Sequence, residues 1–105
     1  MAKVINTSEF RSSVEGSKGV VVVDFFATWC GPCNMLGPVF AELGEDMKDE
    51  ARFVKVDIDE SLEIAQQFSV STVPTMIIFK DGEPVETLIG FMPKNKIEMK
   101  VKSYL

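Results

Sequence analysis

The feature that most constrains the fold is an apolar stretch at residues 20–27, with the sequence Val-Val-Val-Val-Asp-Phe-Phe-Ala. All of its residues except Asp24 are apolar, and most are β-branched or aromatic. A strand with apolar side chains on both faces has to be covered on both faces, as central strands between two layers of helices are. The stretch therefore predicts a central strand, and both cysteines, Cys30 and Cys33, follow shortly after it.

The segments on either side of this strand carry further local patterns. Residues 3–5 form a short apolar run that indicates an edge strand, and Asn6 with Glu9 resembles a helix-capping pair. After the cysteines, apolar residues recur at helical spacing over residues 36–47. Pro38 lies inside this predicted long helix and is expected to kink it.

The second half of the chain continues the alternation of strand and helix patterns. Residues 53–58 alternate as a strand does, and Asp59 is placed to cap a short helix over residues 62–68. Two apolar runs around a Lys-Asp-Gly-Glu turn predict a β-hairpin over residues 76–89. Pro93 fits the first turn of a final helix. This alternation predicts an α/β fold with parallel strands and helices on both faces of the sheet.

The cysteine pair carries the most informative chemistry. Residues at i and i+3 of a helix lie about one turn apart, within the range that a disulfide bridges, so the pair can open and close. If a helix begins at Cys30, its sulfur lies over free backbone N–H groups and the positive end of the helix dipole, which favour a thiolate. Cys30 is thus the candidate nucleophile. Cys33 is expected to be more buried and to act second.

Three other roles for the pair are less favoured. A structural zinc site needs about four ligands, whereas the chain has two Cys and no His. A structural disulfide across so short a loop removes little entropy from the unfolded chain. Two inert buried thiols are the third alternative. Reversible dithiol and disulfide chemistry is favoured over all three, without a metal.

Composition limits the class of protein. The 105 residues, 46% hydrophobic and 26% charged, predict one domain over residues 1–105, which we expect to be a monomer. A formal net charge of −5 argues against nucleic acid or an anionic membrane as partner. The N-terminus lacks a hydrophobic signal segment, so a cytoplasmic protein is expected.

The final helix carries four lysines, which predict a solvated face, with a basic docking patch as the alternative: Lys94, Lys96, Lys100 and Lys102.

Residues 22–33, Val-Val-Asp-Phe-Phe-Ala-Thr-Trp-Cys-Gly-Pro-Cys, resemble the active-site segment of the thioredoxin family. The resemblance continues through residues 55–59, 73–75 and 79–82 and through Gly90. It implies the thioredoxin fold, a central mixed and mostly parallel sheet of four to five strands flanked by about four helices. It also implies a protein disulfide reductase without a bound cofactor, which takes electrons from a thioredoxin reductase and passes them to substrate proteins with disulfides.

Asp24 interrupts the apolar strand, and a buried carboxylate either becomes neutral through a raised pKa or finds a partner. A structural ion pair with Lys55 is one interpretation. The other is that Asp24 accepts the proton that Cys33 loses when it attacks. The resemblance assigns this second role to Asp24 and places Lys55 beside it, so the two interpretations are compatible.

The resemblance also implies a substrate-binding surface around the nucleophile. Pro74 is expected to be cis, with the backbone of Val73 pairing with an extended substrate segment. Trp29 is either a core aromatic residue or a flank of the nucleophile, and the resemblance favours the second. The chain departs from the family pattern at Phe26 and Asn34. The implied surface consists of Trp29, Gly31, Pro32, Val73, Pro74, Gly90 and Phe91.

The sequence is also compatible with two other functions. The chain could act in the opposite direction, as a thiol oxidase or disulfide isomerase, although the Gly-Pro between the cysteines argues against this. It could also be a non-catalytic module that binds proteins through the same apolar surface. A Cys30→Ser change distinguishes a reductase from a binding module, because it abolishes reductase activity and leaves pure binding nearly intact.

Overall fold

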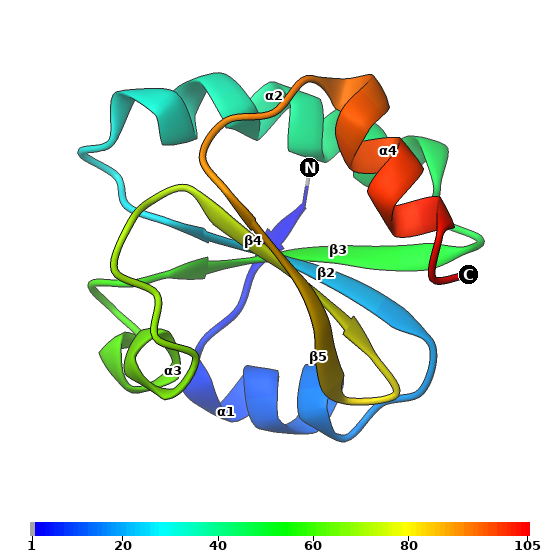
Figure 1. Ribbon diagram of the computed structural model, residues 1–105. Coiled ribbons are helices and arrows are strands. Elements are labelled where there is room, and N and C mark those ends of the chain that lie inside the picture. Colours follow the sequence, from blue (N-terminus) through cyan, green and yellow to red (C-terminus); the bar gives the residue numbers. More distant parts are fainter. Residues whose placement is uncertain (1) are drawn as a thin grey trace.

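A mixed sheet of five strands lies at the centre of the computed structural model, which describes residues 2–105 (Figure 1). The strands follow the spatial order β1-β3-β2-β4-β5. Strands β1 and β2 both run parallel to β3, whereas β4 is antiparallel to β2 and to β5. The strand bounds are β1 (Lys3–Val4), β2 (Val20–Phe26), β3 (Ala51–Asp57), β4 (Thr75–Lys80) and β5 (Glu83–Ile89).

Helices cover both faces of this sheet, as the alternating pattern predicts (Figure 1). Helices α2 and α4 lie on one face, and α1, the π-helical segment η1 and α3 lie on the other. The bounds are α1 (Thr7–Phe10), η1 (Arg11–Glu15), α2 (Gly31–Asp46), α3 (Leu62–Gln67) and α4 (Lys94–Lys102). Within residues 2–105, none of these helices has the length and apolarity that crossing a bilayer requires.

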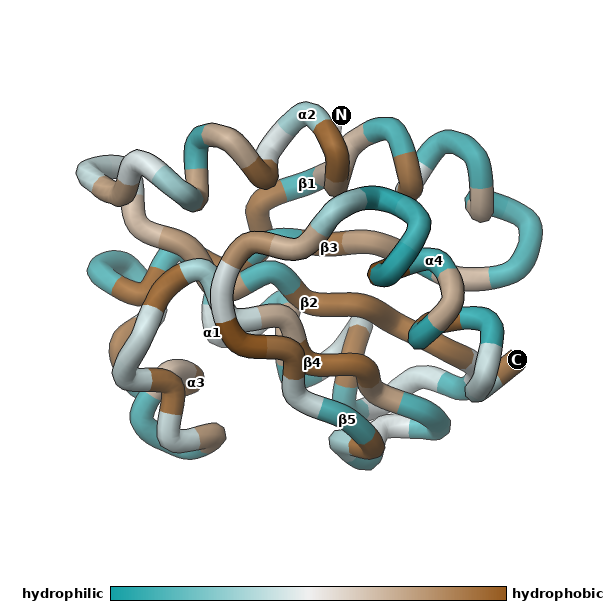
Figure 2. The backbone as a smooth tube through the Cα atoms, turned by 45° about the horizontal axis from the view of Figure 1, so that its top comes forward, coloured by the Kyte–Doolittle hydropathy of each residue, from teal (hydrophilic) through white to brown (hydrophobic). Residues whose placement is uncertain are grey.

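Strand β2 is the central strand that its sequence predicts, and residues 20–25 are all buried. Val20 and Val22 belong to the core under α2 and α4, whereas Val21 and Val23 belong to the core under α1 and α3. The smooth backbone trace shows β2 and β4 as strongly apolar strands in the middle of the molecule (Figure 2). Because side chains alternate along a strand, Asp24 points to the same face as Val20 and Val22.

Several local predictions are confirmed. Asn6 and Glu9 form a capping box at the start of α1. The Glu9 backbone N–H donates to Asn6 Oδ1 and the Asn6 backbone N–H donates to Glu9 Oε1, with nitrogen–oxygen distances of 2.9 and 3.1 Å. Strands β4 and β5 form the predicted hairpin, and its two turn residues, Asp81 and Gly82, both have positive φ, 50° and 84°. Such angles at both positions are those of the tight turns that suit the twist of antiparallel strands.

Two helix starts differ from the prediction. Helix α3 begins at Leu62 after Ser61, so the prediction that Asp59 caps it was wrong. Pro93 is the residue before the first turn of α4 rather than part of it. Helix α2, in contrast, spans the predicted region and continues through Pro38 to Asp46.

Candidate active site

The chain leaves the carboxyl end of β2 and enters α2 at the cysteine pair. Cys30 is the N-cap of α2, and its Sγ accepts a hydrogen bond from the Cys33 backbone N–H at 3.2 Å. Pro32 lies in the first turn, where its missing N–H removes no helical hydrogen bond. The predicted position of the Cys30 sulfur at the start of a helix is therefore confirmed, and this position favours the thiolate.

The two cysteines form a disulfide, with their Cα atoms 5.2 Å apart. Their exposed fractions are similar, 5% for Cys30 and 3% for Cys33, so the expected difference in burial is small in the disulfide form. Ala27, Phe26 and Val73 pack around the pair.

The segment before β4 lies directly against the nucleophile. The Val73–Pro74 peptide bond is cis, as the resemblance implies. The Val73 carbonyl oxygen is 3.6 Å from Cys30 Sγ, so the two atoms are in contact. The structure thus brings together two parts of the chain, residues 30–33 and 73–74, that are far apart in the sequence.

Trp29 is exposed rather than part of the core, with 70% of its surface accessible. Its indole Nε1 donates a hydrogen bond to Asp59 Oδ2 at 2.9 Å, and the Asp59 backbone N–H donates to Asp57 Oδ1 at 2.9 Å. Asp59 therefore orients Trp29. From the sequence, Asp59 was assigned to a helix cap and this contact was missed. The available signal was its position just after β3, because the carboxyl ends of parallel strands β2 and β3 meet at one edge of the sheet.

A third segment reaches the same place from β5. The Gly90 backbone N–H donates to the Pro74 carbonyl oxygen at 2.8 Å, and Gly90 has a φ of 87°, which glycine adopts readily. No heavy atom lies within 4 Å of the position that a Gly90 Cβ would occupy. Phe91 follows with 41% of its surface exposed, and Gly31 and Pro32 are also exposed. The residues expected in the substrate surface thus lie in three adjoining segments: the loop and first turn leading into α2, the segment before β4 and the segment after β5.

Asp24 is fully buried on the α2 side of β2, and neither carboxyl oxygen has a hydrogen-bond partner within the described residues 2–105. Burial raises the pKa of Asp24 to about 6, an effect that the Lys55 charge partly opposes. Lys55 is opposite Asp24 in the β2–β3 register. Its ammonium lies 4.3 Å from the centre of the Phe26 ring. Phe26, one of the two departures from the family pattern, therefore holds Lys55 through a cation–π contact.

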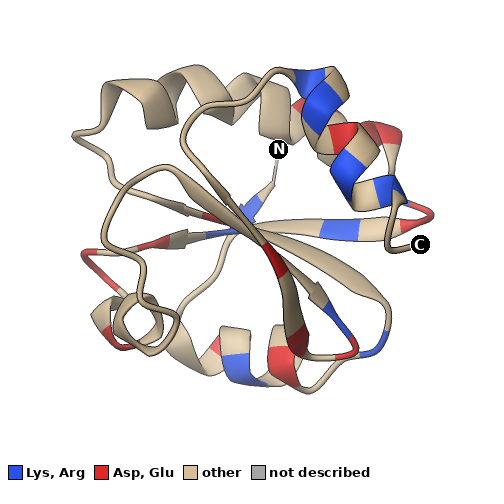
Figure 3. Ribbon diagram, viewed as in Figure 1, with Lys and Arg blue, Asp and Glu red and all other residues tan. Residues whose placement is uncertain are grey.

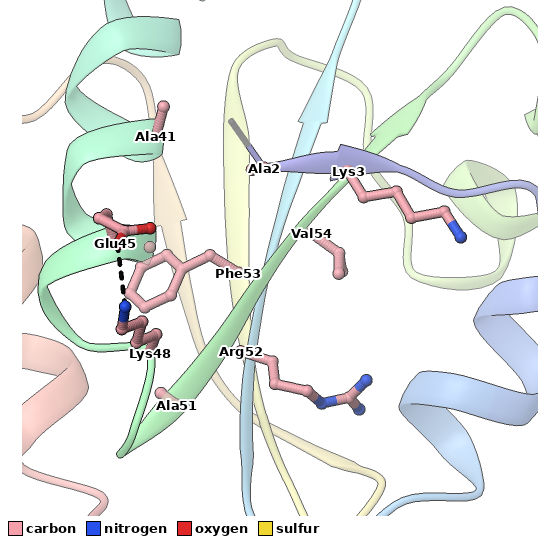
Figure 4. A pocket seen from close by; sticks show the side chains of 10 residues that line it. Ala2, Lys3, Ala41, Glu45, Lys48, Ala51, Arg52, Phe53 and Val54 are labelled. Carbon is pink, nitrogen blue, oxygen red and sulfur yellow. Dashed lines mark hydrogen bonds and ion pairs between the residues drawn. The ribbon is translucent and has the colours of Figure 1, made fainter.

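A separate cleft of about 310 Å³ lies between the carboxy-terminal half of α2 and the edge formed by β1 and β3 (Figure 4). Glu45 and Lys48 form an ion pair at its rim, with Oε1 and Nζ 3.1 Å apart. The cysteines are at the opposite end of α2 and do not line this cleft.

Comparison with known proteins agrees with this geometry. The family model described as thioredoxin matches residues 1–103. A thioredoxin of Listeria monocytogenes is 43% identical over 105 residues, covering 100% of both chains. A thioredoxin of Bacillus subtilis is 43% identical over 102 residues, covering 97% of this chain and 98% of its own.

Solved structures give the same result for the fold. The crystal structure of the Malassezia sympodialis thioredoxin Mala s 13 superposes with a TM-score of 0.88 at 37% identity, covering 99% of this chain and 90% of that one. The open five-stranded sheet and the loop from β2 into α2 are thus those of a thioredoxin fold. With matches in sequence and in structure over essentially its whole length, this chain belongs to the thioredoxin family and is a thiol–disulfide oxidoreductase that acts on protein disulfides.

Proposed function

We propose that this chain acts in the reducing direction, with Cys30 as nucleophile, Cys33 as resolving residue and Asp24 as proton acceptor. The observation that carries the proposal is the position of the Cys30 sulfur as the N-cap of α2, where it accepts the Cys33 N–H. A partial positive charge there stabilises a thiolate, and the thiolate is the form that attacks a disulfide.

The proposed reaction is a pair of thiol–disulfide exchanges. The Cys30 thiolate attacks one sulfur of the substrate disulfide, a bond forms between these two sulfurs, and the substrate S–S bond breaks. The released substrate thiolate takes a proton. Cys33 then loses its proton to Asp24 and attacks Cys30 Sγ, which releases the second substrate thiolate and leaves the Cys30–Cys33 disulfide. The substrate gains two electrons, which the cysteine pair loses.

Burial of Asp24 supports its part in this reaction. A carboxyl group with a pKa of about 6 is mostly ionised at neutral pH and still accepts a proton more readily than an ordinary carboxylate. Lys55, opposite it on β3, is proposed to tune this pKa through its charge. Both side chains lie on the sheet face that α2 covers, the same helix that carries Cys33.

The substrate is proposed to bind as an extended segment along Val73, with its backbone pairing to the Val73 backbone. The closeness of the Val73 carbonyl to Cys30 Sγ supports this, because a segment paired there lies beside the nucleophile. The exposed residues Trp29, Pro32 and Phe91 surround this segment. The whole proposed surface consists of Trp29, Gly31, Pro32, Val73, Pro74, Gly90 and Phe91.

The finer partner assignments are also proposals. We propose that a thioredoxin reductase restores the Cys30–Cys33 dithiol and that the acceptors are substrate proteins with disulfides. We further propose that the chain acts as a monomeric single domain in the cytoplasm. Neither nucleic acid nor a membrane is proposed as a partner, since the net charge is −5.

The direction of the reaction is tested by equilibrating the Cys30–Cys33 disulfide with a graded dithiol buffer at neutral pH and trapping free thiols. A potential well below that of the cytosolic glutathione pool supports the reductase. A potential at or above that pool would contradict it and favour the oxidase or isomerase.

The roles of the two cysteines are tested with serine variants. Cys33→Ser is expected to accumulate a mixed disulfide with a substrate protein, because the attack by Cys30 is intact and the resolving sulfur is absent. Cys30→Ser is expected to form no such adduct and to lose reductase activity. Non-reducing gel electrophoresis after acid quenching detects the adduct. Retention of full activity by Cys30→Ser would refute the assignment of the nucleophile.

A further inference from the structure

Residues 90–93, here called the strap, connect β5 to α4 and contain two residues of the proposed substrate surface, Gly90 and Phe91. The first anchor of the strap is the hydrogen bond from the Gly90 N–H to the Pro74 carbonyl oxygen, 2.8 Å long. It fixes the start of the strap beside the segment that touches Cys30.

The second anchor is an ion-pair clamp at the other end. Lys94, the first residue of α4, reaches across to α2, and its Nζ lies 2.8 Å from Glu42 Oε1 and 2.7 Å from Asp46 Oδ2. Glu42 and Asp46 are one helical turn apart, so both carboxylates converge on one ammonium group. Hydrogen bonds from Lys94 to Asp46 and Glu42 raise the pKa of Lys94. Figure 3 shows the basic positions along α4, which lies beside α2.

At the end of the strap, the Pro93 carbonyl oxygen accepts hydrogen bonds from the Lys96 and Ile97 N–H groups at 3.1 and 3.2 Å, which join the strap to α4, whereas its middle has few contacts. Neither Phe91 nor Met92 makes a backbone hydrogen bond to any residue in the range 2–105. Pro93 has no N–H to donate, and its side chain provides no helix cap. Met92 packs against the core under α2 and α4, whereas Phe91 is turned toward solvent. The position of Phe91 thus depends on the Gly90 anchor, on the packing of Met92 and on the position of α4, which Lys94 ties to α2.

We propose that Lys94, clamped by Glu42 and Asp46, is a positioning residue that holds the strap in place for binding of protein substrates. This inference rests on the proposed function. A strap that is already fixed has less freedom to lose when a substrate binds, so the clamp acts on affinity rather than on the chemical step. A small disulfide that reaches Cys30 without touching the strap does not benefit from the clamp.

The test compares Lys94→Met with the unaltered chain, using insulin as the protein disulfide and 5,5′-dithiobis(2-nitrobenzoate) as the small one. We expect KM for insulin to rise about two- to fivefold, the range that loss of exposed ion pairs gives. The kcat for insulin, the rate with the small disulfide and the Cys30–Cys33 potential are expected to stay unchanged. Lys94→Arg keeps the charge and is expected to restore KM.

Two controls separate the clamp from other effects. The double variant Glu42→Gln/Asp46→Asn removes the clamp but changes the net charge in the opposite direction, and it is also expected to raise KM. Lys100→Met makes the same charge change on α4 but breaks a contact to Glu86 on β5, 3.1 Å long, and is expected to leave KM unchanged. High salt screens the clamp, so the KM ratio between Lys94→Met and the unaltered chain should shrink.

The proposal is overturned if Lys94→Met leaves KM for insulin unchanged, or if the two clamp variants shift KM in opposite directions, as a pure charge effect would. An equal KM rise in Lys100→Met would also overturn it, because the effect would then come from α4 in general. Failure of the proposed function is distinguishable, since the Cys30–Cys33 potential of the unaltered chain would then lie at or above that of the cytosolic glutathione pool.

Discussion

Burial of the Asp24 carboxyl opposes folding at neutral pH. Its folded-state pKa of about 6 lies above the ordinary value of 3.8, so between these pH values the folded chain binds more protons than the unfolded chain. Below about pH 4 the carboxyl is neutral in the folded and the unfolded chain, so its ionisation costs no stability. As the pH rises through 6 the buried group ionises, and that stability is lost. A shift of this size corresponds to about 3 kcal/mol as an upper bound.

Asp24→Asn removes this ionisation and keeps the shape of the side chain. We expect the variant to be more stable than the unaltered chain at pH 7, by up to about 3 kcal/mol, and to differ little from it at pH 4. Urea unfolding at the two pH values measures the difference. Exposed Asp49→Asn serves as the control and should change stability little at either pH. A stabilisation by Asp24→Asn that is equal at pH 4 and pH 7 would contradict this explanation.

Single residues were predictable where their own neighbours in the sequence made them unusual. Asp24 was identified because it is the polar residue in an apolar strand, and Cys30 because the helix pattern follows it. Asp59 was missed because its function depends on Trp29, 30 positions away in the sequence and brought close only by the pairing of β2 with β3. A carboxylate in a loop looks the same in sequence whether it caps a helix or orients an indole.

At the scale of elements, the β4–β5 hairpin depends on its turn. Gly82 has a positive φ, and a Cβ at this position would also collide with the Glu15 carbonyl oxygen at the end of η1. The turn thus packs closely against a helical segment that is remote in sequence. Gly19 likewise has a positive φ of 81°, but the space around it is open.

These two glycines allow the backbone cost and the collision to be separated. Gly19→Ala is expected to destabilise the fold by about 1 kcal/mol, the usual cost of the left-handed conformation for a residue with a Cβ. Gly82→Ala is expected to cost at least about 1 kcal/mol more, because backbone atoms have to move as well. Thermal or urea unfolding of both variants gives the comparison. Equal losses would mean that the contact with Glu15 relaxes freely.

Elements were predictable where the signal is local. The Asn6–Glu9 capping box satisfies its hydrogen bonds within a few residues, and the Asp81–Gly82 turn is marked by residues that adopt positive φ, so the local sequence is enough to predict both. The start of α3 was not predictable in this way, since Ser61, its N-cap, makes no side-chain capping bond there. The anchoring of the strap at residues 90–93 could not be predicted either, because its partners come from the segment before β4 and from α2.

At the scale of the whole molecule, the sheet separates two cores that are both closed by helices. Phe79 of β4 is fully buried on the α1 and α3 side, with ring centres 5.5 Å from Phe10 and 5.2 Å from Phe68, both edge-on. This aromatic cluster joins three elements distant in sequence. Helix–strand alternation predicts that both cores exist, but it does not specify which aromatic rings meet.

Phe79→Ala is expected to destabilise the protein by about 3–5 kcal/mol, because it removes a fully buried ring and leaves a cavity between α1, α3 and the sheet. Val85→Ala, at a partly exposed position of the neighbouring strand β5, is expected to cost less than about 1 kcal/mol. Denaturant unfolding of the two variants tests the difference. A loss of less than about 1 kcal/mol for Phe79→Ala would show that this core collapses around the missing ring.

The central position of β2 has a consequence for amide hydrogen exchange. This strand is paired on both sides, with β3 and with β4, and is covered on both faces, so its N–H groups exchange with solvent only when the whole molecule unfolds. Phe91 and Met92 lack such bonds within residues 2–105, so we expect their N–H groups to exchange without unfolding of the molecule. The cysteine pair therefore follows a strand that we expect to exchange slowly and lies beside a substrate surface whose strap we expect to exchange rapidly.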